Sequence, residues 1–110
     1  MVLGEFEYLL ITAAATLGEN AYGAAMREAI MQATGRGCSI GALYTTLDRL
    51  EAKGLVRTRM AEGTPERGGR SRRMVLVTAA GKTAAESFYD AILRISNRAP
   101  WAAPNTEGAG

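Results

Sequence analysis

The feature that most constrains the fold of this chain is a change in hydrophobic period at Gly54. Before this glycine, apolar residues recur every three or four positions, which is the spacing of one face of an α-helix. After it, short runs such as residues 74–77 are apolar and flanked by polar residues, as in β-strands. The change therefore predicts a helical first part followed by a β-hairpin, and 110 residues leave room for one domain.

Helices are predicted over residues 5–17, 22–34 and 40–53, and each is followed by a glycine that favours termination. Ser39 is the expected N-cap of the third helix, because its hydroxyl can accept a free backbone N–H. The residues expected to face the core are Phe6, Leu9, Leu10, Ala13, Ala14 and Leu17, then Tyr22, Met26, Ala29, Ile30 and Ala33, then Ile40, Leu43, Leu47 and Leu50.

Strands are predicted over residues 56–62 and 71–78, with a polar, glycine-rich tip at about 63–70 between them. A last helix is predicted over 79–98, capped by Thr78 or starting later at a Thr83/Glu86 capping box. The proline- and glycine-containing tail 99–110 is predicted to be disordered. This order predicts a mainly α fold with a small β-hairpin: a winged helix-turn-helix domain over 1–78, then a C-terminal helix over 79–98.

The charge is concentrated in one part of the chain, although the net charge is only +2. Between residues 49 and 73 there are eight basic and three acidic residues, giving +5, and the remainder carries −3. A local basic patch is what a polyanionic partner such as double-stranded DNA requires. An ordinary solvated surface explains the same charges equally well when they are considered alone.

Catalytic and metal-binding chemistry has few candidate residues, since the chain contains no histidine and a single cysteine, Cys38. No Ser-His or Cys-His pair and no zinc-ligand set can form, so we expect no enzyme activity, no metal and no cofactor. There is also no apolar run long enough for a membrane helix and no signal-peptide pattern, so a cytoplasmic location without membrane contact is expected.

The outer face of the third helix has the small and polar side chains that a recognition helix needs in a major groove. Thr45 and Thr46 can contact bases, and Tyr44 either donates its hydroxyl to a phosphate or packs between helices. Arg49 either reaches a phosphate or pairs with Asp48 or Glu51. The full set expected to contact DNA on or next to this helix is Ser39, Gly41, Ala42, Tyr44, Thr45, Thr46 and Arg49.

The tip of the hairpin and its flanks provide a second expected contact, through Arg67, Arg70, Arg72 and Arg73. Arginine on a glycine-rich hairpin suits phosphates or a narrow minor groove, with phosphate contacts expected more than base contacts. A solvent-exposed loop with ordinary charges is the alternative interpretation. The last helix is apolar on more than one side, which predicts a dimer interface formed by Phe88, Tyr89, Ile92 and Ile95.

The stretch from Ser39 to Val56, SIGALYTTLDRLEAKGLV, resembles the recognition-helix signature of the PadR-like transcriptional regulators. Residues 21–23 (AYG), 64–70 (TPERGGR) and 76–81 (LVTAAG) are similar to further motifs of that family, in the same order, so the resemblance covers about residues 3–95. It implies a dimeric winged-helix DNA-binding protein, usually a repressor, with dimerisation through the C-terminal helix and in some members a small aromatic or cationic effector. Longer members carry further C-terminal helices, whereas one short helix is predicted after the hairpin of this chain.

The sequence thus predicts a transcriptional regulator that binds a near-palindromic operator as a homodimer. The alternative hypothesis is a winged-helix module that binds other proteins and not DNA, because one fold can serve several functions. The local charge of +5 favours DNA.

Overall fold

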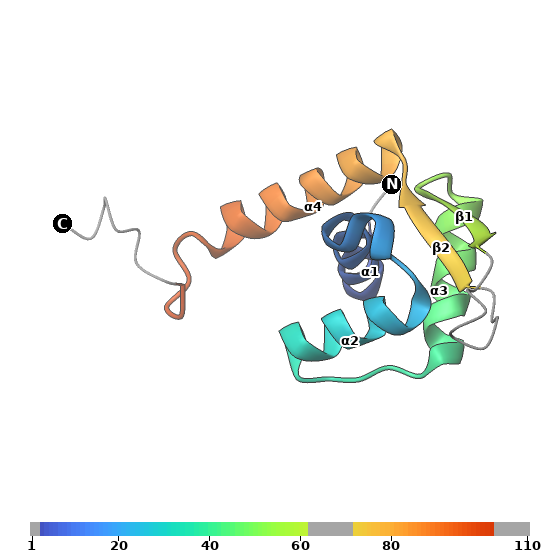
Figure 1. Cartoon of the computed structure of the whole chain (residues 1–110). Coiled ribbons are helices and arrows are strands. Elements are labelled where there is room, and N and C mark those ends of the chain that lie inside the picture. Colours follow the sequence, from blue (N-terminus) through green and yellow to red (C-terminus); the bar gives the residue numbers. More distant parts are fainter. Residues whose placement is uncertain (1–2, 62–71, 103–110) are drawn as a thin grey trace.

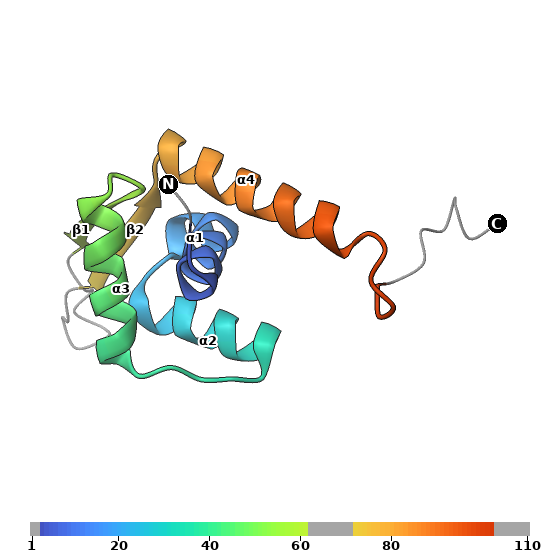
Figure 2. The same ribbon diagram turned by 180° about the vertical axis from the view of Figure 1, so that it is seen from behind.

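Helix α1 lies at the centre of the structure and the other elements pack around it (Figure 1, Figure 2). The computed structural model describes residues 3–61 and 72–102. Within these residues the order of elements is α1 (Glu5–Leu17), a short 3-10 helix (Gly18–Asn20), α2 (Gly23–Thr34), α3 (Ile40–Ala52), β1 (Val56–Ala61), β2 (Arg72–Val77) and α4 (Ala79–Ser96). The predicted mainly α fold with a small hairpin is confirmed.

The helix ends follow from local chemistry that was predicted from the sequence. Gly18, Gly35 and Gly54 end α1, α2 and α3 with φ angles of 57°, 73° and 76°, which glycine adopts without steric cost. The Ser39 hydroxyl accepts the Ala42 N–H at 3.0 Å, and the Thr78 hydroxyl accepts the Gly81 N–H at 3.0 Å. Helix α4 therefore begins directly after Thr78 and not at the later capping box.

The start of α2 differs from the prediction, because Tyr22 lies outside the helix in an extended conformation. Tyr22 forms an isolated antiparallel bridge with Met74 of β2, and the Val75 N–H donates to the Ala21 carbonyl at 2.9 Å. Pairing with β2 satisfies the backbone of this segment, so that the helix begins one residue later, at Gly23. The segment before α2 thus extends the hairpin sheet along its β2 edge.

The hairpin is antiparallel, and its register runs from Val56 opposite Val77 to Ala61 opposite Arg72. Alternation along the strands gives it two different faces. Val56 and Val75 are buried on the inner face, whereas Arg57 and Leu76 are exposed on the outer face. The predicted ends Glu62 and Ser71 and the predicted tip at 63–70 lie outside the described residues.

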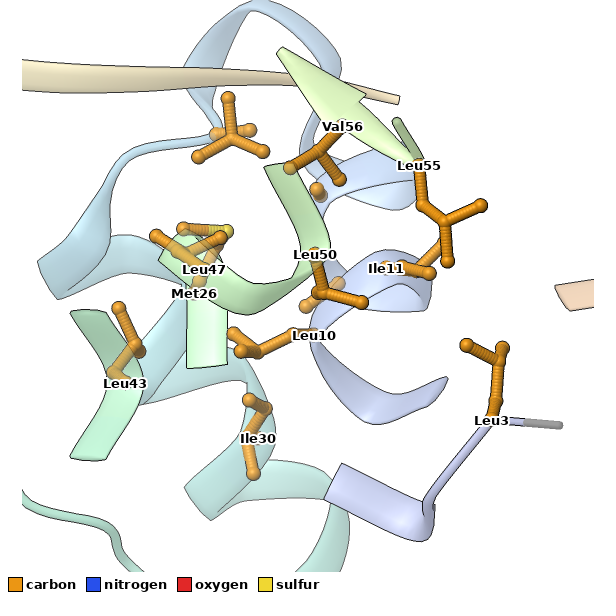
Figure 3. Close-up of a cluster of buried hydrophobic side chains, with 14 residues drawn as sticks. Leu3, Leu10, Ile11, Met26, Ile30, Leu43, Leu47, Leu50, Leu55 and Val56 are labelled. Atoms are coloured by element: carbon orange, nitrogen blue, oxygen red, sulfur yellow. The ribbon is translucent and has the colours of Figure 1, made fainter. Parts of the chain in front are cut away.

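The core fills the space between α1, α2, α3 and the base of the hairpin (Figure 3). Its largest fully buried side chains come from all of these elements: Leu10, Ile11, Met26, Leu43, Leu47, Leu50 and Val56. Two predicted core positions are wrong, since Ile40 is 43% exposed and Ala33 is also exposed. The first turn of α3 lies at the edge of the core, next to the extended connection from α2, so that Ile40 has little to pack against (Figure 1).

A buried carboxylate ties α1 to the end of α3. Glu7 is 7% exposed, and it accepts the Gly4 N–H at 2.8 Å and binds the Lys53 ammonium at 2.8 Å. The hydrogen bond from Gly4, and then the one from Lys53, hold the pKa of Glu7 below its ordinary value. Sequence periodicity did not predict a buried charge on α1.

We predict that Glu7→Gln lowers the free energy of unfolding by about 1–2 kcal/mol at neutral pH, because Lys53 loses its charged partner. The pKa of Glu7 is lower in the folded than in the unfolded chain, so the carboxylate stabilises the fold above the unfolded pKa and loses this effect as pH falls through the folded pKa. Urea unfolding followed by circular dichroism should show that the difference between wild type and variant shrinks as pH falls below the ordinary glutamate pKa of 4.5 and through the lower pKa of the folded chain.

Glu5→Gln is the matched control, since the Glu5 side chain is 73% exposed and its ion pair is with the similarly exposed Arg36. It should change stability little at any pH. A difference between wild type and Glu7→Gln that stays constant over the whole range would contradict the assigned role of the charge.

The turn after α3 and the start of α4 are joined by a compact set of backbone contacts. The Thr78 N–H donates to the Leu55 carbonyl at 3.1 Å, and the Thr78 hydroxyl donates to the Gly54 carbonyl at 2.7 Å. Gly81 is buried against the same turn, and a Cβ atom at this position would overlap with the Leu55 carbonyl oxygen. Glycine is therefore required here by close approach of two backbone segments.

We predict that Gly81→Ala lowers the free energy of unfolding by about 1–3 kcal/mol, because overlap with backbone outweighs the better helix propensity of alanine. Thermal unfolding of the variant measures the loss. Gly41→Ala is the control: an added Cβ there would lie 4.0 Å from the Ser39 hydroxyl oxygen, an ordinary contact distance, so stability should not fall. Equal melting temperatures for wild type and Gly81→Ala would refute the close approach.

The C-terminal part of the described chain differs from the prediction at its boundary. Helix α4 ends at Ser96, and the Ala102 N–H donates to the Ala99 carbonyl at 3.0 Å in a turn that follows. Residues 99–102 of the predicted disordered tail are thus placed in a turn, and 103–110 lie outside the described residues. No helix in the described part of the chain is long and apolar enough to cross a membrane.

Candidate nucleic-acid interface

Helix α3 presents a face free of large apolar side chains. Ala42, Thr45 and Arg49 are exposed, and their spacing of three and four residues places them in one row along the helix. Gly41 is exposed beside the start of this row. Ser39, also exposed, caps the helix through its hydroxyl, so its side chain already has a structural role.

Thr46 does not belong to this face, contrary to the sequence prediction. It is 7% exposed, and its hydroxyl donates to the Ala42 carbonyl at 2.9 Å within the helix. Because Leu43, Leu47 and Leu50 face the core, position 46 lies on the buried side of the helix, one turn before Leu50. The structure thus places Thr46 outside the exposed row, and a base contact of its side chain stays a prediction.

Tyr44 lies half-buried against the start of α2. A Cβ atom on Gly23 would be only 2.6 Å from the Tyr44 hydroxyl oxygen, so the glycine of the predicted AYG motif makes room for this tyrosine. The packing role weighed from the sequence is thus present. A phosphate contact of the same hydroxyl stays a prediction.

The two arginines at the start of β2 point to opposite faces of the hairpin. The Arg72 guanidinium carbon lies 4.4 Å from the ring centroid of Tyr22, a cation–π distance. Arg73 instead faces α3, where its Nη2 lies 2.7 Å from Asp48 and 3.3 Å from Glu51. Arg67 and Arg70 lie outside the described residues.

The carboxylates nearest to Arg49 in the sequence form ion pairs with Arg73 and not with Arg49. The sequence offered Asp48 and Glu51 as alternative partners for Arg49, but the structure pairs both carboxylates with Arg73. Arg49 is exposed and forms no ion pair with any residue in the ranges 3–61 and 72–102. The sequence did not reveal these ion pairs because Arg73 lies 25 positions from Asp48 and 22 positions from Glu51.

Helix α4 is packed along its first half only. Phe88 stacks on Tyr8 of α1, with ring centroids 4.6 Å apart and planes at 23°. Beyond it the helix extends away from the body in both views (Figure 1, Figure 2). The exposed apolar residues there are Tyr89, Ile92, Leu93, Ile95 and, in the turn beyond, Trp101. Of the predicted dimer residues, Phe88 thus packs within the chain and the other three are exposed.

A groove of about 630 Å³ runs between α1, β2 and the first half of α4. Tyr8, Ala15 and Val77 are among its lining residues, and Tyr89 lines it as well as belonging to the exposed apolar residues of α4. The groove is therefore continuous with the unpacked face of α4. Metal chemistry has no candidate site, because no cluster of potential ligands occurs among the residues that the structure describes.

Three helices followed by a hairpin that faces the third helix define the winged helix-turn-helix class. The model of the transcriptional regulator PadR-like family matches residues 14–87. The chain therefore belongs to the PadR-like family of transcriptional regulators, as its recognition-helix and junction motifs predicted. Members of this family are regulators and not enzymes, which agrees with the chemistry of the residues.

Solved structures support the same fold. The complex structure of hsRosR-S1 is 26% identical with a TM-score of 0.65, covering 87% of this chain and 78% of that one. A PadR family transcriptional regulator from Eggerthella lenta is 21% identical with a TM-score of 0.64, covering 84% and 80%. A Streptococcus transcriptional regulator is 18% identical with a TM-score of 0.65, covering 87% and 94%. No curated protein sequence matches the chain.

Proposed function

We propose that this protein is a sequence-specific DNA-binding regulator that acts as a homodimer and represses by occupying a near-palindromic operator. The observation that carries the proposal is the exposed row Ala42, Thr45 and Arg49 on α3. Small and polar side chains allow the helix to enter a major groove, and Arg49, which pairs with no acidic residue in the ranges 3–61 and 72–102, is available for a phosphate or a guanine. Membership of a regulator family supports the same conclusion.

The proposed roles differ along the row. Thr45 would contact base edges, Arg49 a phosphate, and Gly41 and Ala42 would allow the N-terminus of α3 to approach the backbone, where its free N–H groups attract negative charge. Arg72 would provide a further phosphate contact from the outer face of the hairpin. Tyr44 would donate its hydroxyl to a phosphate from its place beside Gly23.

The dimer would form through the exposed half of α4. Ile95 is 80% exposed and Ile92 47%, and a helix in water rarely keeps this much apolar surface uncovered. A second copy brought together here would place two α3 helices about 34–36 Å apart in successive major grooves. The effector implied by the family resemblance stays a prediction; the groove beside Tyr8 and Tyr89 offers aromatic contacts for such a ligand.

The first test is fluorescence anisotropy with a duplex that the wild-type protein selects from a random pool, compared with its scrambled sequence. We expect tight, salt-dependent binding that favours the selected duplex. Arg49→Ala should weaken binding to both duplexes and reduce the slope of log Kd against log salt by about one. Thr45→Val should instead reduce the preference for the selected duplex by about tenfold.

Arg94→Ala is the control, because it removes the same charge from an exposed position on α4, away from α3. It should leave affinity and slope almost unchanged. Failure of the wild-type protein to bind any duplex at low salt would overturn the proposal and favour the protein-interaction alternative.

The dimer is tested by Ile95→Glu, which places a charge in the proposed interface without touching the core of the single chain. We expect the dimer dissociation constant to rise by at least about a hundredfold, seen as a monomer in size-exclusion chromatography with light scattering. Asn97→Glu introduces the same side chain just after α4 and should leave the dimer intact. A wild-type monomer at all concentrations would overturn this part of the proposal.

A further inference from the structure

One arginine joins the hairpin to the recognition helix. Arg73 lies on the inner face of β2 with a side chain that is only 20% exposed. Its Nη2 atom donates to Asp48 at 2.7 Å and to Glu51 at 3.3 Å. Its guanidinium carbon lies 5.7 Å from the centroid of the Tyr44 ring. All three contacts are with residues of α3.

The same acidic residue also holds the other strand. Glu51 accepts the Thr58 N–H at 2.9 Å and the Thr58 hydroxyl at 3.0 and 2.9 Å. These hydrogen bonds, followed by the charge of Arg73, hold the pKa of Glu51 below its ordinary value. Both strands of the hairpin are thus bound to α3 through the carboxylates of Asp48 and Glu51.

The position of these carboxylates is unexpected for a helix that faces DNA. Asp48 has a 68% exposed side chain and directly precedes Arg49 in the exposed row. Uncompensated negative charge at this place would repel phosphates. Arg73 compensates this negative charge. Because its guanidinium binds Asp48 and Glu51, it faces α3 and not the outer face of the hairpin, on which Arg72 lies.

We propose that Arg73 is a positioning residue for DNA binding: through Asp48 and Glu51 it sets the orientation of the hairpin relative to α3, and it does not contact DNA. The inference rests on the proposed function. Asp48 and Glu51 are three positions apart on the helix, so the single Nη2 atom of Arg73 can bind both at once. Lysine is one bond shorter and has no planar group to lie over the Tyr44 ring, and Arg73→Lys should therefore replace arginine poorly.

The experiment measures binding of purified full-length variants to the selected and scrambled duplexes, well below their melting temperatures. The direction in which Asp48→Asn changes the affinity for DNA decides between the two explanations. If electrostatics alone mattered, removing a negative charge beside the recognition face would tighten binding. We expect weaker binding to the selected duplex, by about fivefold, because one half of the link to Arg73 is lost.

Arg73→Gln should weaken this binding by about tenfold, since both ion pairs and the contact with Tyr44 are lost. The double variant Asp48→Asn with Arg73→Gln should match Arg73→Gln alone, because both substitutions break one link. Arg73→Lys should recover less than half of the loss. Asp90→Asn on α4 is the chemically matched control, exposed and without an ion pair in the described ranges, and should bind like wild type.

Tighter binding by Asp48→Asn, together with a salt slope reduced by about one in Arg73→Gln, would show that Arg73 contacts phosphate and would overturn the inference. Unchanged binding in both variants would overturn it as well. Neither outcome touches the proposed function, which fails only if the wild-type protein binds no duplex.

Discussion

The packing of α1 against the other elements is the constraint on which the rest of the structure depends. Leu10 and Ile11 are each only 1% exposed, and between them they contribute to the core shared with α2, α3 and the base of the hairpin (Figure 3). A chain of this size has only one such core, so every surface feature takes its position from it. Helix α3 is held because Leu43, Leu47 and Leu50 face this core, which leaves the row Ala42, Thr45 and Arg49 exposed.

The apolar core alone does not fix the angles between the helices and the hairpin. Hydrogen bonds and ion pairs between these elements fix them. Lys53 at the end of α3 binds Glu7 of α1, and Arg73 of β2 binds two carboxylates in the middle of α3. Backbone hydrogen bonds from Val75 to Ala21 and from Thr78 to Leu55 join the hairpin to the segments before α2 and after α3. Apolar burial is non-directional, whereas these hydrogen bonds specify angles between elements. The helix and the hairpin are therefore presented as one surface.

The start and the end of α4 differ in how they pack against the other elements. Its start is fixed by Thr78 and by the close approach at Gly81, and its first half packs on α1 through Phe88. Beyond Tyr89 the helix carries the exposed apolar side chains Ile92, Leu93 and Ile95 and extends away from the other described elements (Figure 1, Figure 2). A fixed start and an uncovered end are what the proposed dimer would require, because it would have to hold two α3 helices at a defined distance.

The sequence by itself determined the order of the elements and most of their ends, because these depend on local chemistry: hydrophobic period, the caps at Ser39 and Thr78, and glycines at helix ends. It also determined the family, through motifs read along the chain. Only the tertiary structure decided the burial of some individual side chains and their contacts with residues far away in the sequence. Thr46 is buried and Ile40 exposed because the neighbours of α3 cover its middle and leave its first turn open. Glu7, Arg73 and Gly81 have partners far away in sequence, and such contacts exist only once the core has brought the elements together.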